Sequence, residues 1–367
     1  HRMRPASEAE VCDMVQAAGP LVIRGGGTRG IGRAVGQVLE TSGLAGISLY
    51  EPGALTLVAQ AGTPLAEIEA VLAGERQRRA FEVPDLRPLL GRGGVSTIGG
   101  VVATNASGPR RVQVGACRDA LLGVRFVDGR GEVIKNGGRV MKNVTGYDLV
   151  KLLAGSHGAL GVITEVSFKV QAMPEVETTL VGDLEEMAGL VALRAALRSP
   201  FDVSGAAYAE GRAMIRLEGL AGSVGYRRQA LAAVLGGDWD VVEGAASADL
   251  WRQVRDVSAF ADMAGAVWKL SVKPSDAAEI VASLAALEVQ AIYDWGGGLV
   301  WLLVPQDDAG AVRAAVAAKG GHATLMRGLA GMTAAVFPPE PAGVAALTAG
   351  LRAQFDPRGI LNAGIMG

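Results

Sequence analysis

Apolar and polar residues alternate along the first half of the chain in short segments that predict a mixed α and β structure. Residues 5–19 favour a helix, because Ser7 can cap its first turn and Val11 and Val15 fall on one face. The segment 128–131, Asp-Gly-Arg-Gly between two apolar runs, is typical of a hairpin. The expected strands are 21–23, 55–61, 124–127, 132–134 and 161–170, and the expected helices are 65–72 and 149–153.

The pattern changes near Pro174, where alanine-rich amphipathic segments begin to alternate with apolar runs. This alternation predicts a second α+β domain. A last helix is expected from Val344, and a turn-rich segment follows it. The expected helices of the second domain are 184–197, 230–235 and 276–287, and its strands include 213–217 and 299–303.

Composition and charge exclude several classes of protein. The 367 residues carry 35 basic and 37 acidic side chains, a net charge of −2, whereas a nucleic-acid-binding protein normally has a basic excess. Half of the residues are hydrophobic, which excludes intrinsic disorder, and no apolar run reaches the roughly 18 residues of a membrane span. With two cysteines and three histidines, we expect no disulfide framework, no metal site and a reducing, cytoplasmic location.

Glycine is present in excess. The 52 glycines are about twice the usual share of roughly 7%, and they cluster in a few loops between apolar segments. Because glycine has no Cβ, such loops allow the backbone to approach a bound group closely, and phosphate is the usual group. The loops therefore predict a ligand that contains phosphate.

One interpretation of these loops is a nicotinamide dinucleotide site. Residues 25–30 satisfy the G-x-G-x-x-G pattern, and Tyr147 and Lys151 have the Tyr-x-x-x-Lys spacing of short-chain NAD(P)-dependent dehydrogenases. Three features oppose it: the helix expected before the first strand, the lack of a serine in 130–136, and the lack of an acidic residue ending a second strand. We keep it as a remote alternative.

Four segments taken together strongly resemble the FAD-binding fold of the vanillyl-alcohol oxidase/p-cresol methylhydroxylase type. Within that family the resemblance is to the shorter FAD-binding subunits of bacterial glycolate oxidases, and it covers residues 5–172 and 355–367. The four segments are 25–30, 101–108, 141–149 and 155–165. The resemblance implies an α+β protein with a two-subdomain FAD-binding domain over 1–172, an α+β cap or substrate domain over 173–340, and a segment over 341–367 that returns to the FAD-binding domain.

The resemblance also implies which residues hold FAD. No histidine lies near 24–32 or 95–110, so we expect the cofactor to be bound non-covalently. The expected FAD-binding residues are Arg24, Gly25, Gly26, Gly27, Thr28, Arg29 and Gly30 at the pyrophosphate; Pro84, Asp85, Thr97, Ile98, Gly99 and Gly100 beside the ribityl chain and flavin; Ala103, Asn105, Ala106, Ser107 and Gly108 along the dinucleotide; Gly158, Gly161, Val162 and Ile163 at the adenine end; and Asn362 near the isoalloxazine.

Oxidation of a 2-hydroxy acid requires a cation for the carboxylate and a base for the hydroxyl proton. Arg255 and Arg327 are the candidate carboxylate clamp, because a guanidinium binds a carboxylate through two hydrogen bonds, and His322 is the candidate base. The alternatives are solvated arginines and a structural histidine. The turn at 294–298 either faces the flavin or simply connects two strands. The histidine-rich metal and substrate motif of the larger 2-hydroxy-acid dehydrogenases of this class is absent around His322.

The resemblance therefore predicts a FAD-binding subunit of a glycolate oxidase-like complex, which oxidises a small 2-hydroxy acid of the glycolate or lactate type or relays its electrons. The alternative is an assembly subunit that binds FAD without chemistry. The family implies a larger FAD subunit and an iron–sulfur subunit as partners, since Cys12 and Cys117 alone cannot hold a cluster. Any association with the inner membrane would come through these partners.

Overall fold

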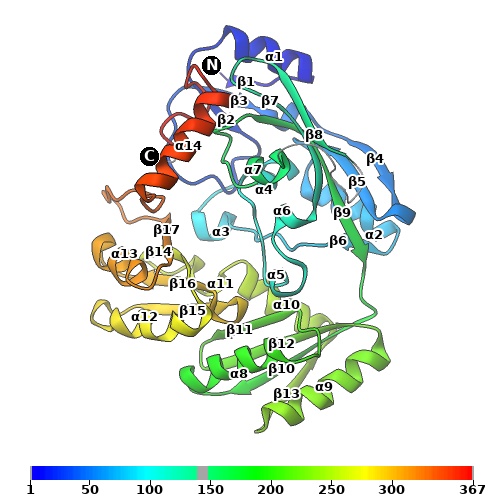
Figure 1. Ribbon diagram of the computed structural model, residues 1–367. Coiled ribbons are helices and arrows are strands. Elements are labelled where there is room, and N and C mark those ends of the chain that lie inside the picture. Colours follow the sequence, from blue (N-terminus) through cyan, green and yellow to red (C-terminus); the bar gives the residue numbers. More distant parts are fainter. Residues whose placement is uncertain (1, 139–147, 366–367) are drawn as a thin grey trace.

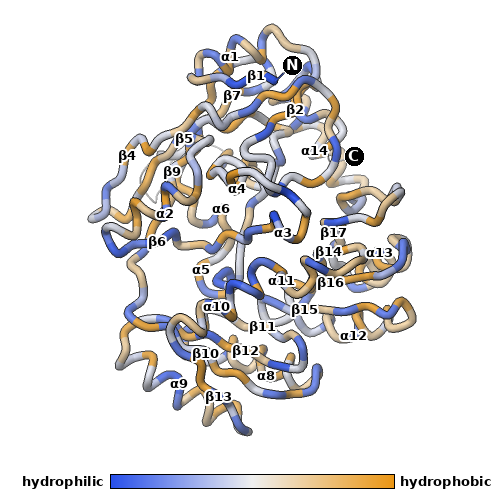
Figure 2. The backbone as a smooth tube through the Cα atoms, turned by 180° about the vertical axis from the view of Figure 1, so that it is seen from behind, coloured by the Kyte–Doolittle hydropathy of each residue, from blue (hydrophilic) through white to orange (hydrophobic). Residues whose placement is uncertain are grey.

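The chain forms two lobes (Figure 1). The computed structural model describes residues 2–138 and 148–365. The upper lobe in Figure 1 contains most of the first half of the chain and also its last helix, whereas the lower lobe is built from the residues between them. The view from behind shows both chain ends in the upper lobe (Figure 2).

A three-stranded parallel sheet lies near the N-terminus, in the order β1 (Arg2–Met3), β3 (Gln37–Glu40), β2 (Leu21–Arg24). Helix α1 (Glu8–Ala17) packs Val11 and Val15 against it. The helix is capped by Ser7, whose hydroxyl oxygen accepts a hydrogen bond from the Glu10 N–H at 3.2 Å. The predicted first helix and first strand are thereby confirmed.

The loop that contains the glycine pattern of residues 25–30, called the glycine loop below, leads from β2 to β3 without an intervening helix. A nicotinamide dinucleotide fingerprint requires a helix directly after this loop, because the pyrophosphate binds at its N-terminus. The nicotinamide interpretation is therefore wrong. Its second element, Tyr147, lies outside the described residues, as does most of the 141–149 segment.

The larger sheet of the upper lobe is antiparallel and forms around one long central strand. Its order is β4 (Ile47–Glu51), β5 (Thr56–Gln60), β9 (Val162–Ala172), β7 (Leu121–Val127) and β8 (Val133–Gly137), with β6 (Gln77–Arg79) also paired to β9. The predicted hairpin at 128–131 is confirmed, because β7 and β8 pair in antiparallel register across it. Helices from the first half of the chain pack apolar side chains into the core of this sheet: α2 (Leu65–Gly74), α4 (Ile98–Ala103), α6 (Cys117–Ala120) and α7 (Leu149–Leu153).

The lower lobe is built on one antiparallel sheet of eight strands. The strand order is β13 (Asp240–Glu243), β10 (Val176–Asp183), β12 (Arg212–Gly219), β11 (Gly205–Ala209), β15 (Gln290–Asp294), β16 (Leu299–Val304), β14 (Ala266–Ser271) and β17 (His322–Arg327). One face is covered by α8 (Glu186–Arg198), α9 (Ala221–Leu235), α12 (Ala277–Ser283) and α13 (Ala309–Ala317). The helix predicted to reach residue 287 ends at Ser283 and continues as a short 3₁₀ turn.

The opposite face of this sheet is covered by helices from both halves of the chain. The apolar side chains of that face pack against α10 (Gly244–Arg255) and α11 (Ser258–Ala261), and also against the short helix α3 (Arg87–Leu90) from the N-terminal half. Leu89 of α3 and Phe260 of α11 belong to the same buried cluster as Trp301 of β16. The two lobes therefore share an apolar interface.

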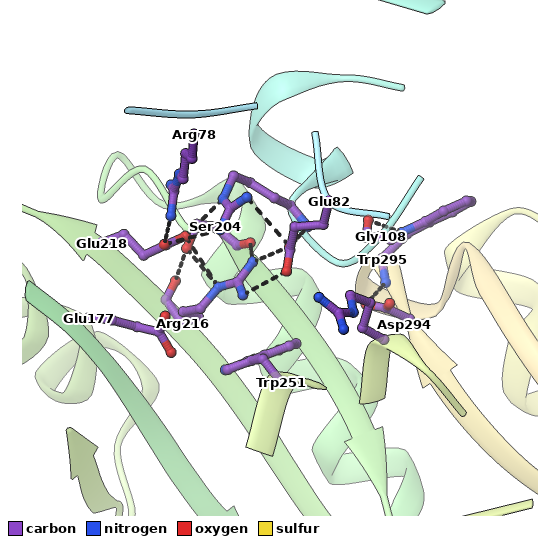
Figure 3. Close-up of polar contacts among 12 residues, drawn as sticks. Arg78, Glu82, Gly108, Glu177, Ser204, Arg216, Glu218, Trp251, Asp294 and Trp295 are labelled. Carbon is purple, nitrogen blue, oxygen red and sulfur yellow. Dashed lines mark hydrogen bonds and ion pairs between the residues drawn. The ribbon is translucent and has the colours of Figure 1, made fainter. Parts of the chain in front are cut away.

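A buried ionic network also joins the lobes (Figure 3). Arg216, on β12, donates to the Glu82 carboxylate at 2.7 Å, and Arg110 donates to the Glu218 carboxylate at 3.1 Å. Arg78 donates to the same Glu218 carboxylate at 2.6 Å. Burial by itself would raise the pKa of Glu82, but the guanidinium groups of Arg216 and Arg110 lower it to about 2. Both carboxylates are therefore ionised at neutral pH and hold the lobes together.

The end of the chain returns to the N-terminal lobe. Phe355, at the end of α14 (Ala342–Phe355), packs edge-on against Phe126 at a ring separation of 6.0 Å. Beyond it, Leu361 bridges to Leu21 of β2 in parallel. In the part of the chain that the structure describes, no helix is both long enough and apolar enough to cross a membrane.

Candidate functional site

A cavity of about 700 Å³ lies between the loop after β2 and the start of α4. Its volume falls in the range of small-molecule and cofactor sites, roughly 300–1,000 Å³. Fifteen of the residues predicted to hold FAD line it: Arg24, Gly25, Gly26, Gly27, Thr28, Arg29, Gly30, Thr97, Gly99, Gly100, Ala103, Gly158, Gly161, Ile163 and Asn362. The fold thus brings together segments from both ends of the chain around one cavity.

The glycines at the start of the loop allow two loops to touch. A Cβ on Gly26 would overlap the carbonyl oxygen of Val95, and a Cβ on Gly25 would lie 2.5 Å from the hydroxyl oxygen of Thr97. Any side chain at either position would push the loop after β2 away from the loop that leads into α4. The narrow, backbone-lined wall of the cavity depends on these glycines.

The cavity is strongly cationic. The side chains of Arg2, Arg24, Arg29, Arg33 and Arg92 line it, and none of the lining residues in 2–138 and 148–365 is acidic. Burial lowers the pKa of Arg92, and the nearby Arg24 lowers it further. An anionic ligand would relieve this crowding of positive charge.

Arg29 provides a direct test of fit for a diphosphate cofactor. Its Nη1 donates to the Pro84 carbonyl at 3.1 Å and its Nη2 to the Ser96 hydroxyl at 2.6 Å. Its Nε is buried and has no hydrogen-bond partner among the described residues. Burial lowers the pKa of Arg29 to about 10, so the side chain stays charged at neutral pH. A buried, charged, unpartnered donor beside a glycine loop fits the anionic half of FAD.

Asn362 closes the cavity from the C-terminal side. Its Oδ1 accepts a hydrogen bond from the Ile23 N–H at 2.6 Å, and its Nδ2 donates to the His157 carbonyl at 2.6 Å. The backbone of Asn362 is left-handed, with φ of 46°, a conformation that asparagine tolerates better than most residues. One side chain thereby fixes three segments around the cavity.

A second, smaller cavity of about 260 Å³ adjoins the first. Arg29, Ile31, Thr104 and His157 line both cavities, so the two compartments share a wall. The lower lobe contributes β14, β16 and β17 to the second cavity, and the upper lobe contributes the segment after α4. Besides Arg29, four of the predicted residues line this second cavity: Pro84, Ala106, Ser107 and His322.

Some predicted FAD-binding residues line neither cavity. Ile98 and Val162 are completely buried in apolar clusters of the upper lobe. Asp85 pairs with Arg87 on its own loop, and Asn105 accepts a hydrogen bond from a backbone N–H through its side chain. The carbonyl oxygen of Gly108 accepts a hydrogen bond across the lobe interface from the indole N–H of Trp295.

The two predicted clamp arginines have other partners. Arg255 is paired with the neighbouring Asp256 at 2.8 Å. Arg327 donates to backbone carbonyls, including that of Phe260 at 3.1 Å and that of Gly265 at 3.2 Å. Neither side chain lines either of these two cavities. The carboxylate clamp at these positions stays a prediction, and the geometry gives both arginines structural contacts.

The structure adds residues that the sequence did not single out as site residues. His157 lines both cavities, and burial, followed by the nearby Lys269, lowers its pKa to about 4. Lys269 lies in β14 between Trp268 and Leu270, and Trp301 is on the neighbouring strand β16. A single lysine inside an apolar strand is a signal that the sequence carries, because lysine is rarely buried without a partner.

Comparisons with known proteins show which family this chain resembles. Residues 1–137 match the FAD binding domain family. The chain is 37% identical over 350 residues to glycolate oxidase subunit GlcE of Escherichia coli K12, covering 95% of this chain and 92% of that protein. It is 33% identical over 181 residues to glycolate oxidase subunit GlcD of Bacillus subtilis, covering 46% of this chain and 35% of that protein.

A solved structure supports the same fold. The alkyldihydroxyacetonephosphate synthase structure superposes with a TM-score of 0.70 at 17% sequence identity, covering 98% of this chain and 76% of that one. At this identity the likeness concerns the fold alone.

Proposed function

Because this chain belongs to the vanillyl-alcohol oxidase-type FAD-binding flavoproteins, in the family of glycolate oxidase subunit GlcE, we propose that it is the FAD-binding subunit of a glycolate oxidase-like oxidoreductase complex. The substrate of this activity is a small 2-hydroxy acid of the glycolate or lactate type. The cavity that joins a cationic glycine loop to a second compartment between the lobes supports this proposal.

The first cavity is the proposed FAD site. The glycine loop and the arginines around it would hold the pyrophosphate, and Asn362 would hold the wall near His157 in place. Bound FAD supplies the acceptor for a hydride taken from the substrate carbon. The second cavity would then receive the hydroxy acid, with His322 as a candidate for the group that takes the hydroxyl proton. FAD is expected to be held non-covalently.

Other subunits are part of the proposal. Cys117 is completely buried and, with Cys12, gives too few ligands for an iron–sulfur cluster. Electrons from the flavin must therefore pass to another protein or to a soluble acceptor. We propose a larger FAD subunit of the GlcD type and an iron–sulfur subunit as partners, in a cytoplasmic complex that reaches the inner membrane only through them.

Asn362→Ala should weaken FAD binding at least about tenfold, because it leaves the Ile23 N–H and the His157 carbonyl without their side-chain partner. The dissociation constant can be measured from the fluorescence of released FAD. Gln354→Ala, at an exposed position near the end of α14, is the matched control and should bind FAD as the unaltered chain does. Equal affinities in both variants would contradict the role of Asn362.

The experiment that tests the function is the visible spectrum of the purified chain, before and after anaerobic addition of glycolate. Flavin bands near ~370 and ~450 nm that bleach on addition are the expected result. Bands that persist would instead indicate the alternative, a FAD-binding assembly subunit that does not turn over substrate alone. A colourless chain that FAD cannot reconstitute would contradict the proposed function altogether.

A further inference from the structure

Two cations from different lobes meet in the second cavity. Arg111, the first residue of α5 (Arg111–Val114), comes from the upper lobe, and Lys269 of β14 comes from the lower one. The Arg111 guanidinium lies 4.3 Å from the ring centre of Trp295, and the Lys269 ammonium lies 5.8 Å from the same ring. Lys269 also lies 5.9 Å from the ring of Trp301. Both cations and both indoles line the cavity.

Neither cation has a carboxylate partner among the described residues. Within residues 2–138 and 148–365, no ion pair is formed by Arg111 or Lys269, and no acidic residue lines the second cavity. Burial, with a smaller effect of Arg111, lowers the pKa of Lys269 to about 8. Two like charges in a partly desolvated space are unfavourable unless an anion lies between them. The indole faces offset only part of this repulsion.

The two positions are fixed by the lobe interface. The residue before Arg111 is Arg110, which is held by Glu218 in the buried ionic network. Trp295 donates its indole N–H to the Gly108 carbonyl at 3.0 Å, and its backbone N–H to the Asp294 carboxylate at 2.7 Å (Figure 3). The arrangement is therefore built by contacts that link both lobes, which is typical of a preorganised binding site.

We propose that Arg111 and Lys269 form the binding site for the carboxylate of a small hydroxy acid, with the indoles of Trp295 and Trp301 bounding its carbon chain. This inference rests on the proposed function, because the hydroxy acid would lie beside the FAD cavity. The guanidinium offers two parallel donors to the carboxylate, and the ammonium adds a compact charge. A volume of about 260 Å³ between two indoles favours acids of a few carbon atoms. These residues, rather than Arg255 and Arg327, supply the carboxylate clamp.

Calorimetric titration of the FAD-loaded chain with oxalate tests the site, because oxalate carries carboxylates but no C–H bond that can be oxidised. We expect saturable binding and a change in tryptophan fluorescence, whereas glycolamide, which has the size of glycolate without its charge, should not bind. K269M and R111Q should each weaken oxalate binding at least about tenfold. R118Q removes an exposed arginine near Arg111 and is the matched control, with unchanged affinity.

The pH dependence of oxalate binding identifies Lys269. Between pH 7 and 9 the unaltered chain should lose affinity as Lys269 loses its proton, whereas K269R should keep its affinity. Guanidinium groups keep their charge in proteins, and burial leaves the pKa of Arg29 at about 10, above this range. His157, with its pKa of about 4, stays neutral.

The outcomes separate this inference from the proposed function. FAD-loaded K269M and R111Q that bind oxalate as tightly as the unaltered chain would overturn the inference and leave the function intact. A chain that does not bind FAD would contradict the function, while titration of that FAD-free chain with oxalate would still test the site. If K269M does not fold, R111Q and K269R decide the result.

Discussion

Gly26→Ala is expected to weaken FAD binding at least about a hundredfold, equivalent to about 2.7 kcal/mol. A Cβ at position 26 would overlap the carbonyl oxygen of Val95, which is a backbone atom and cannot rotate away as a side chain can. The loop after β2 would have to move, and the arginines and backbone N–H groups it carries would no longer converge on one site. The FAD-to-protein ratio after gel filtration, read from the visible spectrum, measures the effect.

Gly93→Ala is the matched control for this substitution. Gly93 lies in the same neighbouring loop as Val95, its backbone is not left-handed, and a Cβ there would have no atom of the described residues within 4 Å. We expect it to retain FAD. If Gly26→Ala retained FAD as well as Gly93→Ala, close contact between the two loops would not be required for FAD binding.

Arg216→Met should lower the free energy of unfolding by about 3–5 kcal/mol, because it leaves charge in the buried network without its partner. Arg216 is 1% exposed and contacts both Glu82 and Glu218. Arg252→Met is the matched control: Arg252 also pairs with a carboxylate, that of Asp249, but both side chains are more than half exposed. Arg252→Met should lower the free energy of unfolding by less than about 1 kcal/mol. Urea unfolding followed by circular dichroism compares the two.

The same network predicts a loss of stability in acid. The pKa of Glu82 is lowered in the folded chain to about 2, and that of Glu218 is lowered as well, although burial alone would raise both. Groups of this kind stabilise the fold fully above their ordinary pKa near 4.5, and the contribution disappears as the pH falls toward 2. Arg216→Met should show a shallower dependence of stability on pH in this interval. If the stability of Arg216→Met fell with pH as steeply as that of the unaltered chain, the network would not be the cause of the acid sensitivity. Equally small losses of unfolding free energy in Arg216→Met and Arg252→Met would also contradict the role of the network.

Local features of the fold could be predicted from the sequence because they depend on neighbouring residues. The Ser7 cap and the hairpin turn at 128–131 are set by side chains a few positions apart. The glycine loops could be located from the clustering of glycines in the sequence, and the resemblance to a known family then predicted that they hold FAD.

The substrate side of the site could not be predicted in the same way. Arg255 was predicted as a clamp because a guanidinium can bind a carboxylate through two hydrogen bonds, but in the structure the adjacent Asp256 occupies its guanidinium. Arg111 and Lys269 lie in different lobes, so their meeting at Trp295 depends on how the lobes dock. Docking is decided by the buried network and the apolar interface, which involve contacts between residues far apart in the chain.

The bridge between Leu361 and Leu21 has a consequence for the order of assembly. The N-terminal segments emerge first during synthesis, yet the wall that Asn362 holds in place cannot form until residue 362 has been made. Joining segments so distant along the chain carries a large loop-closure cost, which favours late formation of this contact. FAD should therefore enter after translation has passed this point, so a nascent chain stalled in the lower lobe would not yet retain its flavin.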